Sequence, residues 1–203
     1  EYAACLALLE PEEAAASDEE LLLLARSAVS AAEQALLREA FHDAARDAAR
    51  ALEWNRRGLY AQDDISLRAL AVLARSAAPA ERDEAVQNYR AQYLLAPEDV
   101  GYHLLMARYH LEQEHVQAAE REIWSIAELP EAYRAEYLIL RGRIAARKEQ
   151  FENAALYLHQ AEELELAPVL QRELYQGLEV CSREMGQYQQ AYEYASKQLA
   201  MQK

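Results

Sequence analysis

Among the residues of the sequence, three histidines resemble a metal-binding motif most closely in residue type and spacing. His103 and His110 are seven residues apart, which places them on one side of a helix, and His115 follows in an expected turn. Histidines that share a metal on one helix are usually four residues apart and need further ligands around the ion. We therefore expect polar surface or groove histidines, and we assign no metal and no cofactor to the chain.

The abundant carboxylates show no catalytic arrangement. Many of the 35 acidic residues stand in runs such as PEEAAASDEE at 11–20, which suit solvated helix faces and helix caps. The sequence contains no glycine-rich phosphate loop, no nucleophile elbow and no metalloprotease helix motif. Acid–base catalysis needs carboxylates that converge in a pocket, and linear spacing does not show convergence. We expect no enzyme activity.

Charge and cysteine usage exclude several other classes of function. A net charge of −14 argues against DNA, RNA or anionic lipid as the main partner, because these ligands are bound by clustered Lys and Arg. The two cysteines, Cys5 and Cys181, are too few for a disulfide framework or a metal cluster. Cys181 falls in step with Leu174 and Leu178, which predicts a small buried apolar residue. No run of 18 apolar residues exists, so we expect no membrane span.

The composition predicts helices joined by short connections. Hydrophobic residues make up 52% of the 203 residues, whereas there are only 5 Gly and 5 Pro to form turns. Ser17 and Glu20 form a capping box before the apolar run from Leu21. Apolar residues then recur at helical spacing to the end of the chain, so the fold class is expected to be all-α with about nine helices.

A short motif recurs among these helices. An aromatic residue followed three positions later by alanine occurs as FHDA at 41–44, FENA at 151–154 and YQQA at 188–191. Weaker copies stand at Ala85 and at Ala118 or Ala119, so the anchors recur every 33 to 41 residues. A period in this range, made of two helices, is typical of helical solenoids. The small residues let paired helices approach closely, and Ala154→Leu is expected to overpack that contact by about 1–3 kcal/mol.

At these positions the sequence resembles the tetratricopeptide repeat family. The residues that carry the resemblance are Gly142, Phe151, Ala154 and Ala161, then Gly186, Tyr188 and Ala191, with Pro97, Pro130 and Pro168 as repeat-ending prolines. The resemblance implies a right-handed α-solenoid of antiparallel helix pairs, as a single domain over 1–203. Its expected parts are a lone helix over 1–16 and repeats over 18–57, 61–97, 99–130, 132–168 and 170–203.

The resemblance also implies that the first helix of each pair lines a concave groove that binds a partner. The residues expected there are His103, Met106, His110, Glu136, Ile139, Arg143, Arg147, Gln176 and Arg183. Arg143 and Arg147 point the same way on one helix, and guanidinium groups bind carboxylates bidentately. The arginines therefore either take an acidic side chain or chain terminus of the partner, or pair with the neighbouring Glu136, Glu173, Glu179 or Glu184.

The function expected first is a non-catalytic scaffold that binds a protein or peptide partner, in a setting such as assembly or export machinery of a bacterial envelope. That setting rests on analogy of fold alone. The alternatives are a regulatory input domain of a larger signalling or transcription protein and, ranked below it, a module that binds a glycan or polysaccharide. The sequence starts at Glu1 and stops at Lys203 inside a helical pattern, so we expect a piece of a longer chain. Its compartment, periplasmic or cytoplasmic, and its oligomeric state stay open.

Overall fold

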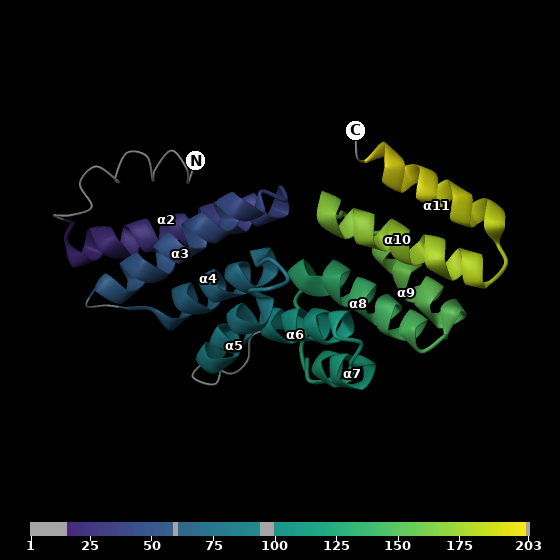
Figure 1. Ribbon diagram of the computed structural model, residues 1–203, viewed down its shortest axis with the longest axis horizontal. Coiled ribbons are helices and arrows are strands. Elements are labelled where there is room, and N and C mark those ends of the chain that lie inside the picture. Colours follow the sequence, from purple (N-terminus) through teal and green to yellow (C-terminus); the bar gives the residue numbers. More distant parts are fainter. Residues whose placement is uncertain (1–15, 59–60, 94–99, 202–203) are drawn as a thin grey trace. The chain divides into compact units, whose positions relative to one another are not determined.

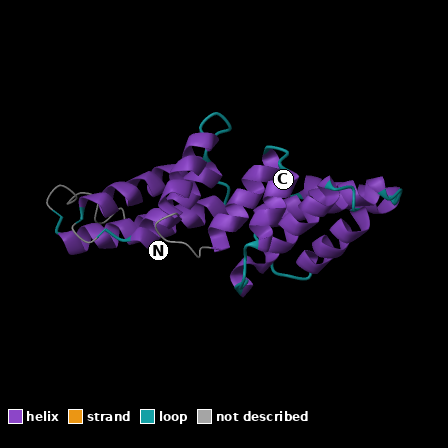
Figure 2. Ribbon diagram, turned by 90° about the horizontal axis from the view of Figure 1, so that it is seen from below, coloured by secondary structure: helices purple, strands orange, loops and turns teal. Residues whose placement is uncertain are grey.

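The regular elements of the described chain are helices. A computed structural model describes residues 16–58, 61–93 and 100–201, and within these ranges it contains ten α-helices, one short 3₁₀ helix and no strand (Figure 2). In chain order they are α2 (Asp18–Leu37), α3 (Phe41–Arg57), α4 (Asp63–Ser76), α5 (Arg82–Tyr93), α6 (Val100–Glu112), α7 (Val116–Trp124), η2 (Glu131–Tyr133), α8 (Arg134–Arg147), α9 (Phe151–Glu162), α10 (Pro168–Glu184) and α11 (Tyr188–Ala200) (Figure 1). The all-α prediction is confirmed, and the expected number of helices was one too low for the described ranges. The lone helix expected over 1–16 and the residue Cys5 lie outside the described residues, apart from Ala16.

The α-helices pack in adjacent pairs, and each pair falls in one of the predicted repeat ranges with one exception. The exception is the pair of α10 and α11, because α10 begins at Pro168, before the predicted range 170–203, whereas we expected Pro168 to end the preceding repeat. Proline suits this position because its fixed φ is helical and because the amide it lacks would have no partner in the first turn. Pro97, another expected repeat end, lies outside the described residues.

Four of the five pairs are joined by the same turn. Two residues after the end of each first helix stands a residue with positive φ, namely Glu39 (59°), Glu114 (62°), Glu149 (59°) and Gly186 (76°). The amide of the next residue then donates to a carbonyl five residues back, at 2.8–2.9 Å, as in a Schellman motif. That next residue also has nearly constant dihedral angles, with φ from −81° to −92° and ψ from 61° to 64°. The sequence repeat is therefore also a repeat of backbone geometry.

The repeated turn places one small residue at the same point of each second helix. Ala44, Ala119 and Ala154 are fully buried, and Ala191 is 7% exposed. Of the two alternatives that the sequence left open, Ala119 occupies the buried position and Ala118 does not.

The pair α4–α5 departs from this pattern. Its connection contains Pro79, and α4 ends at an extended Ala77 in place of a left-handed residue. Ala85, which we aligned with the buried alanines, is only half-buried, whereas Val86 and Tyr89 are buried. The predicted anchor in this pair was therefore wrong, because the proline changes the connection on which the alignment depends.

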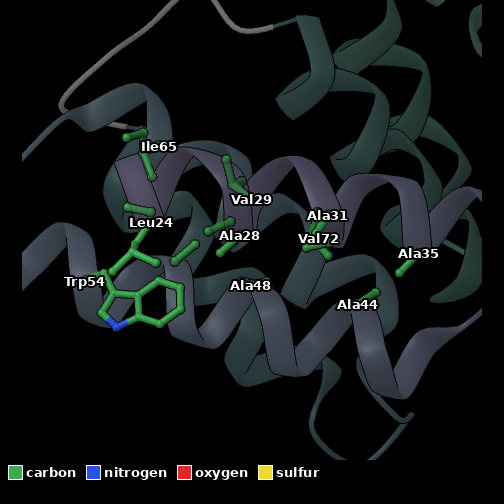
Figure 3. Close-up of a cluster of buried hydrophobic side chains, with 14 of the residues drawn as sticks. Leu24, Ala28, Val29, Ala31, Ala35, Ala44, Ala48, Trp54, Ile65 and Val72 are labelled. Atoms are coloured by element: carbon green, nitrogen blue, oxygen red, sulfur yellow. The ribbon is translucent and has the colours of Figure 1, made fainter. Parts of the chain in front are cut away.

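The contacts divide the chain into two compact units, Glu1–Asp99 and Val100–Lys203, which we call unit 1 and unit 2 and describe separately. The prediction of a single domain over 1–203 stays a prediction. In unit 1, α2 packs on α3 and α4, and α4 packs on α3 and α5. Figure 3 shows alanines filling the interface of α2 and α3, with Ala35 and Ala44 near the turn and Trp54 beside Leu24 at the other end. The capping box predicted at Ser17 and Glu20 is present.

Unit 2 consists of three helix pairs, and its first helices α6, α8 and α10 contact one another in order. The helices α8 and α9 approach each other closely. A Cβ atom added to Gly142 would lie 2.6 Å from Cγ of Leu158 and 3.3 Å from the carbonyl oxygen of Ala154. Glycine on α8 and alanine on α9 therefore bring the two backbones together, as the small residues predicted.

Candidate functional site

A pocket of about 360 Å³ opens in unit 2 between the first helices of its three pairs. The lining residues are Arg108 and Glu112 of α6, Gly142, Arg143, Ala146 and Arg147 of α8, Leu158 of α9, and Glu173, Gln176, Gly177 and Val180 of α10. The volume lies at the lower end of the range for ligand-binding pockets. Its walls combine a charged side with an apolar floor.

The repeated backbone geometry brings two of the arginines together. Arg108 and Arg143 each stand six residues before the left-handed residue of their turn, Glu114 and Glu149 respectively. They therefore occupy equivalent positions on α6 and α8, which are neighbours in unit 2. Glu173 reaches both of them from α10.

Each oxygen of the Glu173 carboxylate accepts a hydrogen bond from a different arginine. Nη1 of Arg108 donates to Oε1 at 2.5 Å, and Nη1 of Arg143 donates to Oε2 at 3.3 Å. Arg108 also donates to Oε1 of Glu136 at 3.1 Å. All four side chains are less than a third exposed, so solvent weakens these interactions less than it would weaken surface ion pairs.

The two arginines differ in how completely their charges are compensated. Burial alone would lower the pKa of Arg108, but the charges and hydrogen bonds of Glu173 and Glu136 outweigh burial and raise the pKa above its ordinary value. For Arg143, burial and the charges of Arg108 and Arg147 outweigh the attraction of the nearby carboxylates and lower the pKa. Both groups stay protonated at any physiological pH. Arg143 is thus the less well neutralised cation of the pair.

Arg147 lies at the more exposed edge of the pocket. Its side chain is 44% exposed and forms an ion pair with Glu114, whose side chain is 76% exposed. Ion pairs between exposed side chains contribute about 0–1 kcal/mol, so this pair restrains Arg147 only weakly. Arg147 is therefore the pocket arginine that an incoming group can recruit most easily.

The structure gathers three of the nine expected site residues around the pocket, namely Arg143, Arg147 and Gln176. Glu136 lies next to them as a partner of Arg108, and Ile139 is fully buried in the hydrophobic core of unit 2. Arg183 pairs on its own helix with Glu179 at 2.8 Å and with Glu184 at 3.6 Å. The alternative in which the arginines pair with Glu136, Glu173, Glu179 or Glu184 is confirmed for Arg143 and Arg183, whereas Arg147 pairs with Glu114.

The three remaining residues, all on α6, do not line this pocket. Nδ1 of His103 lies 2.8 Å from Oε2 of Glu122 on α7, the second helix of the same pair. Met106 is buried, and the ring of His110 lies 6.3 Å from the ring of His115 in the turn. The residues that we predicted on α6 therefore lie on a different face of their helix from the residues that we predicted on α8.

Sequence reasoning missed Arg108, Glu112 and the bridging role of Glu173. A signal for the first two was present in the spacing of the turns. Glu114 and Glu149 are 35 residues apart, and subtracting this period from Arg143 and Arg147 gives Arg108 and Glu112. The signal was missed because the helices were aligned on their small residues and histidines.

The chemistry available at the pocket is the binding of an oxyanion. Three arginines and two glutamates line the pocket of a chain whose net charge is −14, and Glu136 and Glu114 pair with two of these arginines at its edge. Guanidinium groups bind carboxylates through two parallel hydrogen bonds. Within the part of the chain that the structure describes, no group of three or more His, Cys, Asp or Glu is placed to hold a metal ion. No helix there is both long and apolar enough to cross a membrane.

In comparisons with family models, with curated proteins and with solved structures, the chain matches none of them.

Proposed function

We propose that this chain is a non-catalytic scaffold that binds a protein partner, and that the partner docks over the arginine-lined pocket of unit 2. The observation that carries the proposal is the cluster of three arginines at a pocket formed by three neighbouring first helices. A row of neighbouring first helices offers an extended surface, which suits a polypeptide better than a small compact ligand.

We extend the proposal to the architecture. The repeated turn, the buried alanine after it and the contacts between α6, α8 and α10 support a right-handed solenoid of the tetratricopeptide kind. In such an array the first helices form one continuous face, which is where the pocket opens. A role in an assembly or export system of a bacterial envelope stays a prediction from analogy of fold.

The test is affinity capture from a lysate of the source organism, read by mass spectrometry. Three baits are compared, namely the wild type, Arg147→Glu and Arg183→Glu. Arg147 and Arg183 are matched because both are exposed, both stand on first helices of unit 2 and both pair with glutamate, whereas only Arg147 lines the pocket. Circular dichroism confirms that each bait is folded.

We expect a partner that the wild type and Arg183→Glu retain and that Arg147→Glu loses. The partner would then also be the starting point for naming a pathway. Equal retention by all three baits would move the binding surface away from the pocket. Capture of no protein by the wild type would reject the scaffold proposal.

A further inference from the structure

Glu173 occupies the position in which an external carboxylate would be held. Each of its two oxygens accepts a charge-assisted hydrogen bond from a different arginine, and the two arginines stand on different helices. The carboxylate comes from the wall of an open pocket, and its side chain is 21% exposed. The carboxylate-binding site is therefore complete, but Glu173 of the same chain occupies it.

The contacts of Glu173 are unequal, and this inequality makes exchange feasible. Arg108 has a second carboxylate partner in Glu136, so it keeps one ion pair if Glu173 turns away. Arg143 holds Glu173 at the longer distance of 3.3 Å, and burial and the charges of Arg108 and Arg147 lower the pKa of Arg143. Exchange of one carboxylate for another on Arg143 conserves the charge balance of the site, so it avoids the large cost of leaving a buried charge unpaired.

The space beside Glu173 suits the stem of an acidic side chain. Gly142, Ala146, Gly177 and Val180 form apolar or side-chain-free walls of the same pocket. A Cβ added to Gly177 would lie 2.9 Å from Cδ1 of Leu158, so the glycine keeps the floor of the pocket open against a packed leucine. A pocket of about 360 Å³ holds more than a carboxylate group alone.

We propose that the pocket binds a carboxylate of an acidic peptide segment in place of Glu173, which acts as an internal competitor for Arg108 and Arg143. This inference rests on the proposed function, because it names the chemical group by which the partner is recognised. A carboxylate is favoured over a phosphate because the two arginines already hold a singly charged, planar group with one oxygen each.

The test replaces Glu173 by glutamine, which removes the competing carboxylate and keeps the shape of the side chain. A short fluorescein-labelled peptide with two adjacent glutamates and an amidated C-terminus is titrated against the wild type and Glu173→Gln, with fluorescence anisotropy as the readout. Glu179→Gln is the matched control. Glu179 stands on the same helix, has a side chain 22% exposed and pairs with an arginine, but it does not line the pocket. Glu112→Gln adds the same positive charge to the pocket without touching the carboxylate that bridges the arginines.

We expect Glu173→Gln to bind the peptide about tenfold more tightly than the wild type, which corresponds to about 1.4 kcal/mol. Glu179→Gln is expected to match the wild type, and Glu112→Gln to gain less than Glu173→Gln. Equal gains at Glu112 and Glu173 would overturn the exchange, because general electrostatic attraction would then explain both. An unchanged or weaker affinity of Glu173→Gln would overturn it as well.

Further peptides identify the source of the oxyanion. A glutamine version of the peptide is expected to lose binding, and a version with a free C-terminus separates recognition of the chain end from recognition of a side chain. A phosphoserine peptide that gains from Glu173→Gln while the glutamate peptide does not would overturn the carboxylate assignment.

An independent readout uses the wild type alone, in case Glu173→Gln does not fold. Carbon-13 NMR of the side-chain carboxyl groups is expected to show a shift for Glu173 on saturation with the peptide and none for Glu179. A stationary Glu173 signal at saturation would overturn the exchange. The proposed function is judged separately by lysate capture. If a partner depends on Arg147 but Glu173→Gln leaves the peptide affinity unchanged, this inference is overturned and the proposed function is retained.

Discussion

The tight contact between Gly142 and Leu158 permits a stability prediction with a defined sign. Alanine is a better helix former than glycine by about 1 kcal/mol, so Gly142→Ala would stabilise an isolated helix. In unit 2 the new Cβ would meet Cγ of Leu158 at 2.6 Å and Cδ2 at 2.8 Å, with the carbonyl oxygen of Ala154 behind them at 3.3 Å. Leu158 is fully buried, and its Cγ atom cannot move away from the new Cβ unless α9 moves with it. Overpacking of this kind costs about 1–3 kcal/mol.

The steric cost is expected to exceed the helix-propensity gain, so Gly142→Ala should destabilise unit 2 by about 1–2 kcal/mol. Gly177→Ala provides an internal comparison. Its Cβ would meet the same leucine at 2.9 Å, but at the end methyl Cδ1, which can shift by side-chain rotation. We expect a smaller effect for Gly177→Ala, within about 1 kcal/mol of zero.

A double-mutant cycle with Leu158→Ala tests the cause directly. Leu158→Ala alone is expected to cost about 2–5 kcal/mol because it leaves a cavity. In that background Gly142→Ala no longer meets the leucine, so its effect should change sign and stabilise by about 1 kcal/mol. The coupling between the two positions should then be about 2–3 kcal/mol, as is usual for residues in contact.

Thiol labelling of Cys181 supplies an assay specific for unit 2. Cys181 is fully buried in the same hydrophobic cluster as Leu158, so labelling requires this cluster to open. The measurement uses Cys5→Ser protein, in which Cys181 is the remaining cysteine of the two in the sequence. Each 1.4 kcal/mol of lost stability should raise the labelling rate about tenfold. Gly142→Ala protein that is labelled as slowly as its parent, or a cycle without coupling, would refute the close approach of α8 and α9.

Three further predictions concern single residues elsewhere. Ser17→Ala removes the capping box at the start of α2 and should cost about 1 kcal/mol, read as a lower midpoint of urea unfolding. Gly186→Ala should cost about 1 kcal/mol because its φ of 76° disfavours a side chain, whereas Glu149→Gly should stabilise by a similar amount at the equivalent turn, both read by thermal unfolding. Burial raises the pKa of the Cys181 thiol from 9.0 to about 11, so the labelling rate of the native protein should rise with pH up to about 11. Because the unfolded chain loses this proton first, the thiol's contribution to stability should fall as pH rises from about 9 to about 11, and a native labelling midpoint near 9 would contradict the burial.

The helical class, the pairing of helices and most turn positions could be predicted from the sequence because their causes are local. Capping at Ser17 acts over three residues, and the turn before Phe151 is built from hydrogen bonds within six residues. At three of the four turns, the alanine that follows is locally marked by an aromatic residue three positions before it, namely Phe41, Phe151 or Tyr188. The prediction failed at Ala85, where a proline changed the local rule.

The candidate site depended on tertiary structure to a much greater degree. The sequence by itself selected Arg143 and Arg147, because two arginines four residues apart must share a side of one helix. Only the packing of α6, α8 and α10 decided that Glu173, 65 residues from Arg108 along the chain, would bridge Arg108 and Arg143. The pairing of charged side chains between helices depends on how those helices are rotated and spaced. At this site, Gly142 and Gly177 let α8 and α10 pack closely on Leu158 of α9, and no local pattern records the result.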